Sequence, residues 1–225
     1  MSVFAETYQQ LNKELNAKNI TLVAVSKTKP VEDIQELYDL GHRDFGENYV
    51  QELADKQALL PKDIRWHFIG HLQSNKVKYI APFVYLIQGV DSFNLLKEIN
   101  KQASKNNRVI DVLLQIHIAQ EETKFGLDEE ELNLLIKEYD DLQMKNVRIC
   151  GLMGMASFTD DMNKVRKEFQ YLKTIFNKHA PLQTAHCKLQ TLSLGMSSDY
   201  KIAIEEGSTL VRIGSLLFGE RNYQK

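Results

Sequence analysis

One lysine stands out by its position in the sequence. Lys27 directly follows Leu22–Ser26, a segment that is almost wholly apolar, where a lysine is costly to bury. Desolvation lowers the pKa of an amine, and the neutral amine can attack an aldehyde to form a Schiff base. A solvated lysine just past the end of a strand is the plainer interpretation, and this segment taken alone favours it.

Two glycine-containing turns near the end of the chain favour the interpretation of Lys27 as a nucleophile. Gly195–Ser198 precedes a helical stretch that starts at Asp199, and Gly214-Ser215 precedes the short segment Leu216–Gly219. Backbone N–H groups and hydroxyls at helix starts bind phosphate, although ordinary turns with serine N-caps would look the same. An amine nucleophile beside a phosphate cradle indicates a phosphorylated aldehyde. Pyridoxal 5′-phosphate (PLP) as a cofactor and a sugar phosphate as an aldolase substrate both fit.

Short apolar runs rich in β-branched residues alternate with amphipathic stretches along the chain. Such runs are typical of parallel strands that are buried on both faces. The predicted strands are Ile20–Ser26, Arg43–Phe45 (the weakest), Arg65–Ile69, Phe83–Val90, Ile110–Ile118, Val147–Met155, Thr191–Leu194 and Thr209–Ile213. The predicted helices are Val3–Leu15, Val31–Leu40, Phe93–Ala103, Glu129–Glu138, Met162–Phe176 and Asp199–Glu206.

This alternation predicts the fold. Repeated β-then-α units require a parallel sheet with right-handed crossovers. About eight units in 225 residues predict an α/β protein with a single (β/α)8 TIM-type barrel domain over 1–225 and an extra N-terminal helix. An open doubly wound sheet is the alternative, but no GxGxxG follows the first strand, which weakens its dinucleotide-binding form. Barrels carry their functional groups at the C-terminal ends of the strands, often with phosphate after strands seven and eight. Lys27 and both glycine turns fall there.

The composition excludes several other classes. With 28 Lys and Arg against 30 Asp and Glu, the net charge of -2 argues against nucleic-acid binding. No apolar run is long enough for a membrane span, and the first residues lack the pattern of a secretory signal, so we expect a cytoplasmic protein. Cys150 and Cys187 lack metal-ligand spacing, so no metal site is predicted.

Several segments together carry a family resemblance. They are Ala24–Pro30, Phe45–Glu52, Trp66–Lys76, Lys124–Gly126, Gly151–Met153, Leu192–Ser197, and Val211–Gly214 with Phe218-Gly219. In this order the chain closely resembles the PLP homeostasis proteins, which share the barrel of the alanine racemase N-terminal domain. The segments run from residue 24 to residue 219, so the resemblance covers nearly the whole chain.

The resemblance implies a role for each matching residue. Lys27, and not Lys29, would carry PLP as a Schiff base. The other implied contacts are Ser197, Gly214 and Ser215 at the phosphate, Met196 and Asn48 lining the site, and Arg212 at the pyridine nitrogen. Departures from the family pattern are His117, Ala156–Phe158, and an apparent insert around Cys187-Lys188 before the seventh strand.

Other polar residues near strand ends have simpler interpretations. We interpret Trp66 and His67 as a packed aromatic cluster with one hydrogen-bonded histidine. Glu47 is expected to be a surface carboxylate at the start of a helix. The run Gln73–Lys76 is interpreted as a helix start on the rim of the site.

Three functions remain open from the sequence: a non-catalytic PLP-binding protein that buffers, delivers or regulates vitamin B6 cofactor, a PLP-dependent racemase, and a Schiff-base aldolase. An arginine at the ring nitrogen weakens the electron sink that transamination needs, although alanine racemase also uses one. Racemisation needs a second acid–base group, which alanine racemase takes from a tyrosine associated with an added domain. The chain ends at Lys225, so we expect no such domain and no catalytic residues. The expected partners are PLP and apo-enzymes that receive it, and the expected state is a monomer or weak dimer.

Overall fold

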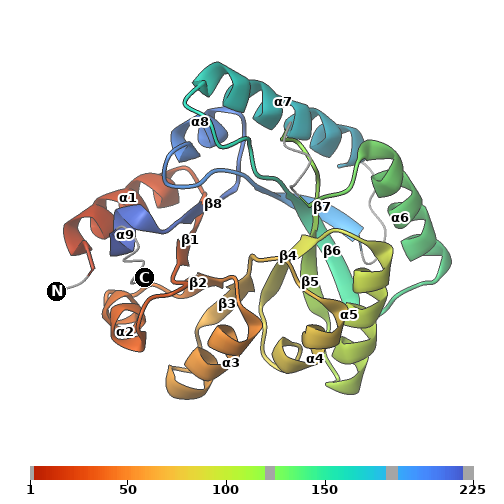
Figure 1. Ribbon diagram of the computed structural model, residues 1–225, viewed down its shortest axis with the longest axis horizontal. Helices are drawn as coiled ribbons and strands as arrows, with labels where there is room; N and C mark the ends of the chain where they lie inside the picture. Colours follow the sequence, from red (N-terminus) through yellow and green to blue (C-terminus); the bar gives the residue numbers. More distant parts are fainter. Residues whose placement is uncertain (1–2, 120–124, 181–186, 220–225) are drawn as a thin grey trace.

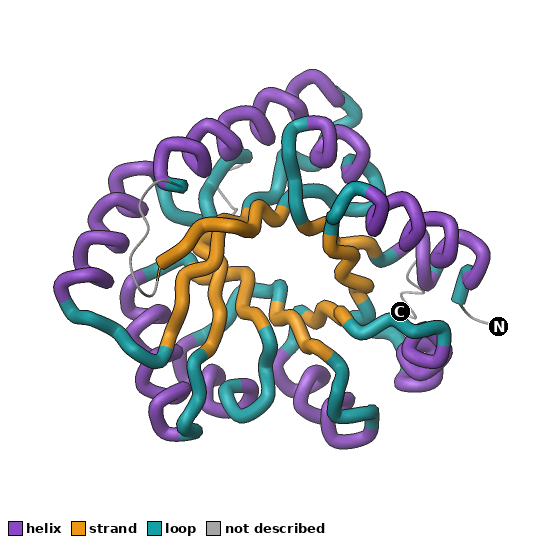
Figure 2. Tube along the Cα trace, turned by 180° about the vertical axis from the view of Figure 1, so that it is seen from behind, coloured by secondary structure: helices purple, strands orange, loops and turns teal. Residues whose placement is uncertain are grey.

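Eight parallel strands close into a barrel in the computed structural model, which describes residues 3–119, 125–180 and 187–219. Each strand pairs with its sequence neighbours, and β1 pairs with β8. Helices surround the strands on the outside (Figures 1 and 2). The predicted (β/α)8 TIM-type barrel, with a helix before the first strand, is therefore confirmed.

The strands are β1 (Thr21–Val25), β2 (Asp44–Glu47), β3 (Arg65–Phe68), β4 (Leu86–Val90), β5 (Ile110–Gln115), β6 (Val147–Met153), β7 (Cys187–Ser193) and β8 (Leu210–Ile213). The helices are α1 (Ala5–Ala17), α2 (Val31–Asp39), α3 (Val50–Leu59), the 3-10 turn η1 (Ser74–Lys76), α4 (Val77–Ile80), α5 (Phe93–Lys105), α6 (Glu129–Asp141), α7 (Met162–His179), α8 (Tyr200–Glu205) and α9 (Ser215–Phe218). Among these described elements, no helix has the length and apolar character needed to cross a membrane.

The clearest differences from the sequence prediction concern β7 and α3. The seventh strand begins at Cys187, which pairs with Ile149 on β6. Cys187 and Lys188, interpreted as part of an insert, therefore belong to the first half of β7, where buried and exposed residues alternate. Helix α3 was not among the predicted helices, because only Leu53 and Lys56 of its residues are buried. Two buried positions give almost no helical pattern.

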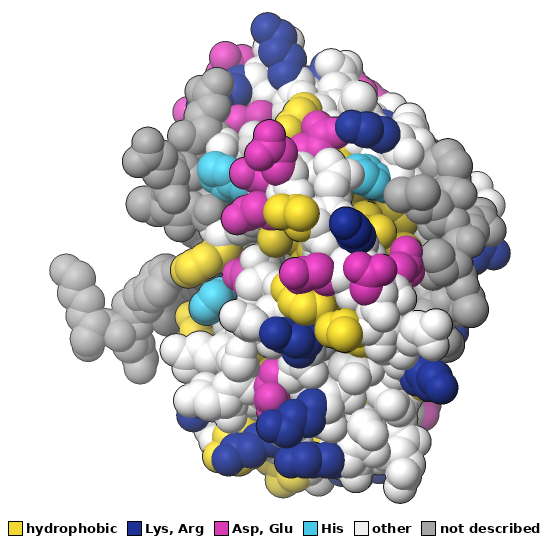
Figure 3. Space-filling view, turned by 90° about the vertical axis from the view of Figure 1, so that its right-hand side faces the viewer, with side chains coloured by type: hydrophobic (Ala, Val, Ile, Leu, Met, Phe, Trp, Pro, Cys, Tyr) yellow, Lys and Arg dark blue, Asp and Glu magenta, His cyan; other side chains and the backbone are white. Residues whose placement is uncertain are grey.

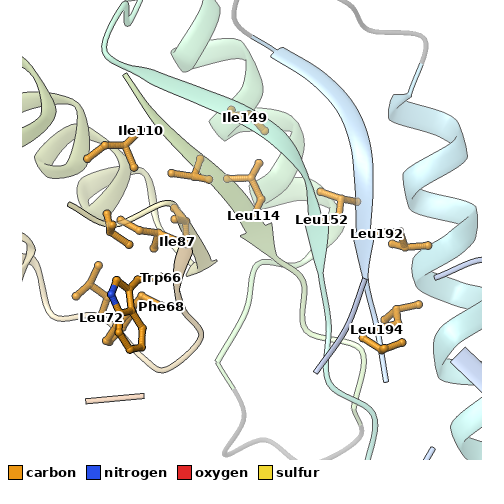
Figure 4. Packing of buried hydrophobic residues seen from close by; sticks show 14 of the residues in the cluster. Trp66, Phe68, Leu72, Ile87, Ile110, Leu114, Ile149, Leu152, Leu192 and Leu194 are labelled. Atoms are coloured by element: carbon orange, nitrogen blue, oxygen red, sulfur yellow. The ribbon is translucent and has the colours of Figure 1, made fainter. Parts of the chain in front are cut away.

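Apolar side chains fill both sides of the barrel wall. On the outer side, large residues from neighbouring strands pack under the helices, among them Trp66, Phe68, Ile87 and Leu114 (Figure 4). A smaller, separate cluster comprises Val23, Leu86, Leu113, Met153 and Leu210. It fills the barrel interior as in other barrels of this size, so the interior is a packed core and not a channel.

Surface charge is mixed on the face formed by the right-hand side of Figure 1. Acidic and basic side chains both occur on it, with basic ones gathered at the lower edge of the view (Figure 3). No single sign of charge dominates this face.

Candidate functional site

A cavity of about 500 Å³ lies at the C-terminal ends of the strands. Segments that follow β1, β2, β7 and β8 contribute most of its polar lining. All seven residues singled out from the sequence line it, namely Lys27, Asn48, Met196, Ser197, Arg212, Gly214 and Ser215. The fold thus brings together residues that are up to 188 positions apart in the sequence, from Lys27 to Ser215 (215 minus 27).

Lys27 lies in a tight turn directly after β1. The Ser26 N–H donates to the carbonyl of Gly46, and the Lys29 N–H donates back to the Ser26 carbonyl, both at 3.0 Å. Thr28 has a positive φ of 64°, which is uncommon for a residue with a side chain. Its N–H donates to Glu52 Oε1 at 2.6 Å. The turn is therefore held on both sides of Lys27.

Lys29 also lines the cavity, but its amine has a structural role. Its Nζ donates to the Phe218 carbonyl at 2.7 Å, at the end of α9. Helix α9 is held from the other side by α1, where the Phe4 N–H donates to the Leu217 carbonyl at 2.9 Å. Of the two lysines near β1, Lys29 fastens the short helix that follows the Gly214 turn.

The two glycine turns lie against each other. The Gly214 N–H donates to Ser197 Oγ at 3.2 Å, which joins the turn after β8 to the turn after β7. Gly195 has φ +93°, and a Cβ there would lie 2.7 Å from Ala203 Cβ, so this turn needs glycine. The Met196 N–H donates to Asp199 Oδ1 at 2.6 Å. The paired turns present hydroxyls and backbone N–H groups at the starts of α8 and α9.

Arg212 forms the buried floor of the cavity. It is only 4% exposed, and burial lowers the pKa of its guanidinium to about 10. Nη1 donates to the Ser193 carbonyl and Nη2 to the Gly154 carbonyl, both at 3.0 Å, and Nη1 also donates to Ser193 Oγ. These contacts satisfy part of its donor capacity and fix its orientation.

Asn48 supplies a polar atom without a partner. Its Oδ1 is buried and makes no hydrogen bond with any described residue. A buried polar atom left unpaired costs free energy, and such atoms in a cavity are typical of a ligand site. Asn48 also lines a second cavity of about 410 Å³, which contains Gln73 and Lys76. The run Gln73–Lys76 accordingly lies on the rim next to the main cavity.

Glu47 is not the surface carboxylate that the sequence suggested. Its side chain is fully buried, where Oε1 accepts from Ser26 Oγ at 2.6 Å and from Lys56 Nζ at 2.8 Å. Lys56 Nζ also donates to the Ser26 carbonyl at 2.8 Å and to Glu52 Oε1 at 2.6 Å. Sequence reasoning missed Lys56, although a lysine four residues after Glu52 in a helix is a detectable signal. These groups brace the turn that carries Lys27.

Trp66 and His67 occupy opposite sides of the barrel wall. Trp66 packs outside against Phe45, with ring centroids 6.0 Å apart. His67 is buried and hydrogen-bonded, as expected, but to Asp44 and Gln88 and not within an aromatic cluster around Trp66. Phe158, one of the departures from the family pattern, lines the cavity while 92% exposed. Lys124, part of one matching segment, lies outside the described residues.

Comparisons with known proteins agree with this geometry. The family model for the alanine racemase N-terminal domain matches residues 2–222. The pyridoxal phosphate homeostasis protein of Aquifex aeolicus is 47% identical over 204 residues, which cover 90% of this chain and 87% of the relative. The human protein of the same name is 39% identical, with 95% and 81% covered.

Solved structures show the same relationship. PipY of Synechococcus elongatus, solved with PLP bound, superposes with a TM-score of 0.86 at 34% identity, covering 96% of this chain and 99% of PipY. An alanine racemase of Clostridium difficile shares only the fold, with a TM-score of 0.74 at 15% identity, and the chain spans 57% of its length. The chain therefore belongs to the pyridoxal phosphate homeostasis protein family, built on the barrel of the alanine racemase N-terminal domain.

Proposed function

We propose that this protein binds PLP covalently through Lys27 and serves in PLP homeostasis without catalysing amino-acid turnover. The observation that carries the proposal is the joint placement of seven residues around one cavity, in a chain 34% identical to a protein solved with PLP bound. The relatives named as homeostasis proteins support the same role.

The residues of the cavity fit the parts of PLP. When bound, PLP supplies an aldehyde that condenses with the Lys27 amine, so that a C=N bond forms and water leaves. Ser197, Ser215 and the Gly214 turn offer hydroxyls and helix-start N–H groups to the phosphate. Arg212 brings a guanidinium to the floor, and the buried Asn48 Oδ1 lacks a partner. Lys27 lines the cavity directly after β1, at the position where the family resemblance implies the nucleophile.

The lining of the cavity supports a non-catalytic role. Among its described residues there is no carboxylate, histidine, tyrosine or cysteine. Two-base racemisation needs a second acid–base group on the face opposite the lysine. Lys29, the other amine of the lining, is engaged with the carbonyl of Phe218. The site offers binding groups, and we infer that PLP taken up here is passed to apo forms of PLP-dependent enzymes.

Two assays on one preparation test this proposal. Chiral chromatography follows interconversion of common amino acids, and recovery of activity by an apo-enzyme follows PLP transfer. We expect transfer that Lys27→Ala abolishes, and no racemisation. Racemisation at about 1 s⁻¹ or faster, an ordinary enzyme rate, and lost in Lys27→Ala, would replace the proposal with a PLP-dependent racemase.

The phosphate contacts have their own test. Ser197→Ala removes one hydrogen bond to a charged acceptor, worth ~1.5–3 kcal/mol, or roughly a ten- to hundredfold loss of PLP affinity. Gly214→Val should weaken binding further, because an added Cβ already lies 3.3 Å from the Val25 carbonyl oxygen. Parent affinity in both variants would place the phosphate elsewhere.

A further inference from the structure

A line of buried polar side chains crosses the barrel interior and ends at Arg212. Its members are Ser193 on β7, Gln88 on β4, His67 on β3 and Asp44 on β2. Ser193 Oγ lies 2.7 Å from Gln88 Oε1, and Gln88 Nε2 lies 3.1 Å from His67 Nδ1. His67 Nε2 lies 3.0 Å from Asp44 Oδ1. Because β4 and β7 are not neighbours in the sheet, the contact between Ser193 and Gln88 spans the barrel.

The orientation of the Gln88 amide, with Oε1 toward Ser193 and Nε2 toward His67, sets the direction of every hydrogen bond in this line. Arg212 can only donate, so Ser193 Oγ accepts from it and gives its own proton to Gln88 Oε1. The amide of Gln88 then donates through Nε2, which makes His67 Nδ1 an acceptor. His67 therefore carries its proton on Nε2 and donates it to Asp44.

The far end of the line is anchored near the N-terminal ends of the strands. Asp44 also accepts from Arg65 Nε at 2.7 Å. Burial alone would raise the pKa of Asp44, but hydrogen bonds from Arg65 and His67 hold it well below its usual range. The Asp44 carboxylate is therefore a fixed acceptor. All hydrogen bonds of the line are donated in the direction from Arg212 to Asp44.

We propose that Ser193, Gln88 and His67 are positioning residues that hold the Arg212 guanidinium in place for the ring of PLP. The inference rests on the proposed function, since it assigns a purpose to residues that do not line the cavity. The serine hydroxyl is the side-chain acceptor for Arg212, and its free rotation is removed by Gln88. A guanidinium held beside the pyridine nitrogen disfavours protonation of that nitrogen. If the Arg212 guanidinium were free to move away, the pyridine nitrogen would be protonated more easily.

Three variants of the PLP-loaded protein separate positioning from packing. Gln88→Leu cuts the line, whereas in Gln88→Glu a carboxylate still accepts from Ser193 Oγ and can accept from a protonated His67. Gln102→Leu is the matched control, because Gln102 is a buried glutamine of α5 bonded to Glu98 and remote from the line. The charged residues of the described lining, Lys27, Lys29 and Arg212, are kept in all three.

The measurements are the PLP dissociation constant, the pH at which the pyridine nitrogen of bound PLP is protonated, and the melting temperature. We expect Gln88→Leu to bind PLP about three- to tenfold more weakly, as the loss of one hydrogen bond implies, and to titrate at higher pH. Gln88→Glu keeps an acceptor for Ser193 Oγ and should bind PLP more tightly than Gln88→Leu, and Gln102→Leu should change only the melting temperature. If Gln88→Leu does not fold, Ser193→Ala removes the side-chain acceptor of Arg212 itself and should show the same two shifts.

Several results would overturn the inference. They are parent affinity and parent titration in Gln88→Leu, shifts of the same size in Gln102→Leu, or a Gln88→Glu variant that binds PLP no more tightly than Gln88→Leu. A PLP-independent check is the ¹⁵N NMR spectrum of His67 in the protein without PLP, where the line requires the proton on Nε2 and a proton on Nδ1 would refute it. A parent that takes up no PLP would instead refute the proposed function, and the NMR result would still decide the polarity of the line.

Discussion

Two carboxylates on the same short strand show how differently one barrel wall treats a buried charge. Asp44 and Glu47 are the first and last residues of β2, and because they are an odd number of positions apart they face opposite sides of the sheet. Asp44 points into the barrel and accepts from both Arg65 and His67. Glu47 points toward α3 and uses one oxygen for both Lys56 and Ser26, while Oε2 has no partner among the described residues.

The pKa values of these two groups move in opposite directions. The hydrogen bonds from Arg65 and His67 outweigh the burial of Asp44 and lower its pKa. For Glu47 the burial prevails over Lys56 and Ser26 and raises the pKa. The number and placement of donors therefore decide whether a buried carboxylate of this barrel stabilises the fold. Asp44 holds the far end of the polar line that leads to Arg212. Glu47 braces the turn of Lys27, but the burial of its carboxylate costs folding free energy.

The largest effect should come from removing the cation beside Glu47. Lys56→Met leaves a buried carboxylate without its counter-charge, and breaking such a pair costs about 3–5 kcal/mol of unfolding free energy. Urea denaturation at neutral pH measures this loss. The double variant Lys56→Met with Glu47→Leu is the control and should recover most of it. A single variant as stable as the parent would show that Glu47 is already neutral there.

A smaller loss is expected on the inner side. Asp44→Asn weakens the contacts to Arg65 and His67, and hydrogen bonds to charged groups contribute about 1.5–3 kcal/mol. Because Arg65 is half exposed, solvent screening places the loss near the lower end, about 1.5 kcal/mol. The depressed pKa of Asp44 means that its contribution is present above the unfolded value of 3.8 and is lost as the pH falls through the folded value.

The pH series distinguishes this contribution from packing. The parent should lose stability on acidification more steeply than Asp44→Asn, so the difference in stability between the two should begin to narrow below about pH 4. A gap that stays constant across the series would mean that the carboxylate charge is not what stabilises this region.

The smallest effect should come from Glu47→Gln, since the amide can still accept from Ser26 and Lys56. The folded pKa of Glu47 lies above the unfolded value of 4.5, so the native state holds the proton longer than the unfolded chain does. Ionisation of Glu47 therefore favours unfolding as the pH rises from about 4.5. Stability of Glu47→Gln relative to the parent should increase over that range in thermal melts. A decrease would show that pairing with Lys56 outweighs burial.

The sequence was sufficient for the barrel and, together with the family resemblance, for seven of the residues that line the cavity. Apolar runs identify strands, and the barrel rule places Lys27, Ser197 and Gly214 at one end. The burial of Glu47 could not be predicted, because its partner Lys56 lies on a helix with little apolar pattern. The contact between Gln88 and Ser193 joins strands that are not neighbours, and no spacing rule connects such positions.

The central claim is that Lys27 is the amine that holds PLP. The direct measurement is borohydride reduction of the PLP-loaded protein followed by peptide mass mapping. We expect a yellow protein that loses its absorbance band on reduction and carries a single pyridoxyl-phosphate mass on Lys27. The mass on Lys29 or Lys76, with Lys27 unmodified, would contradict it.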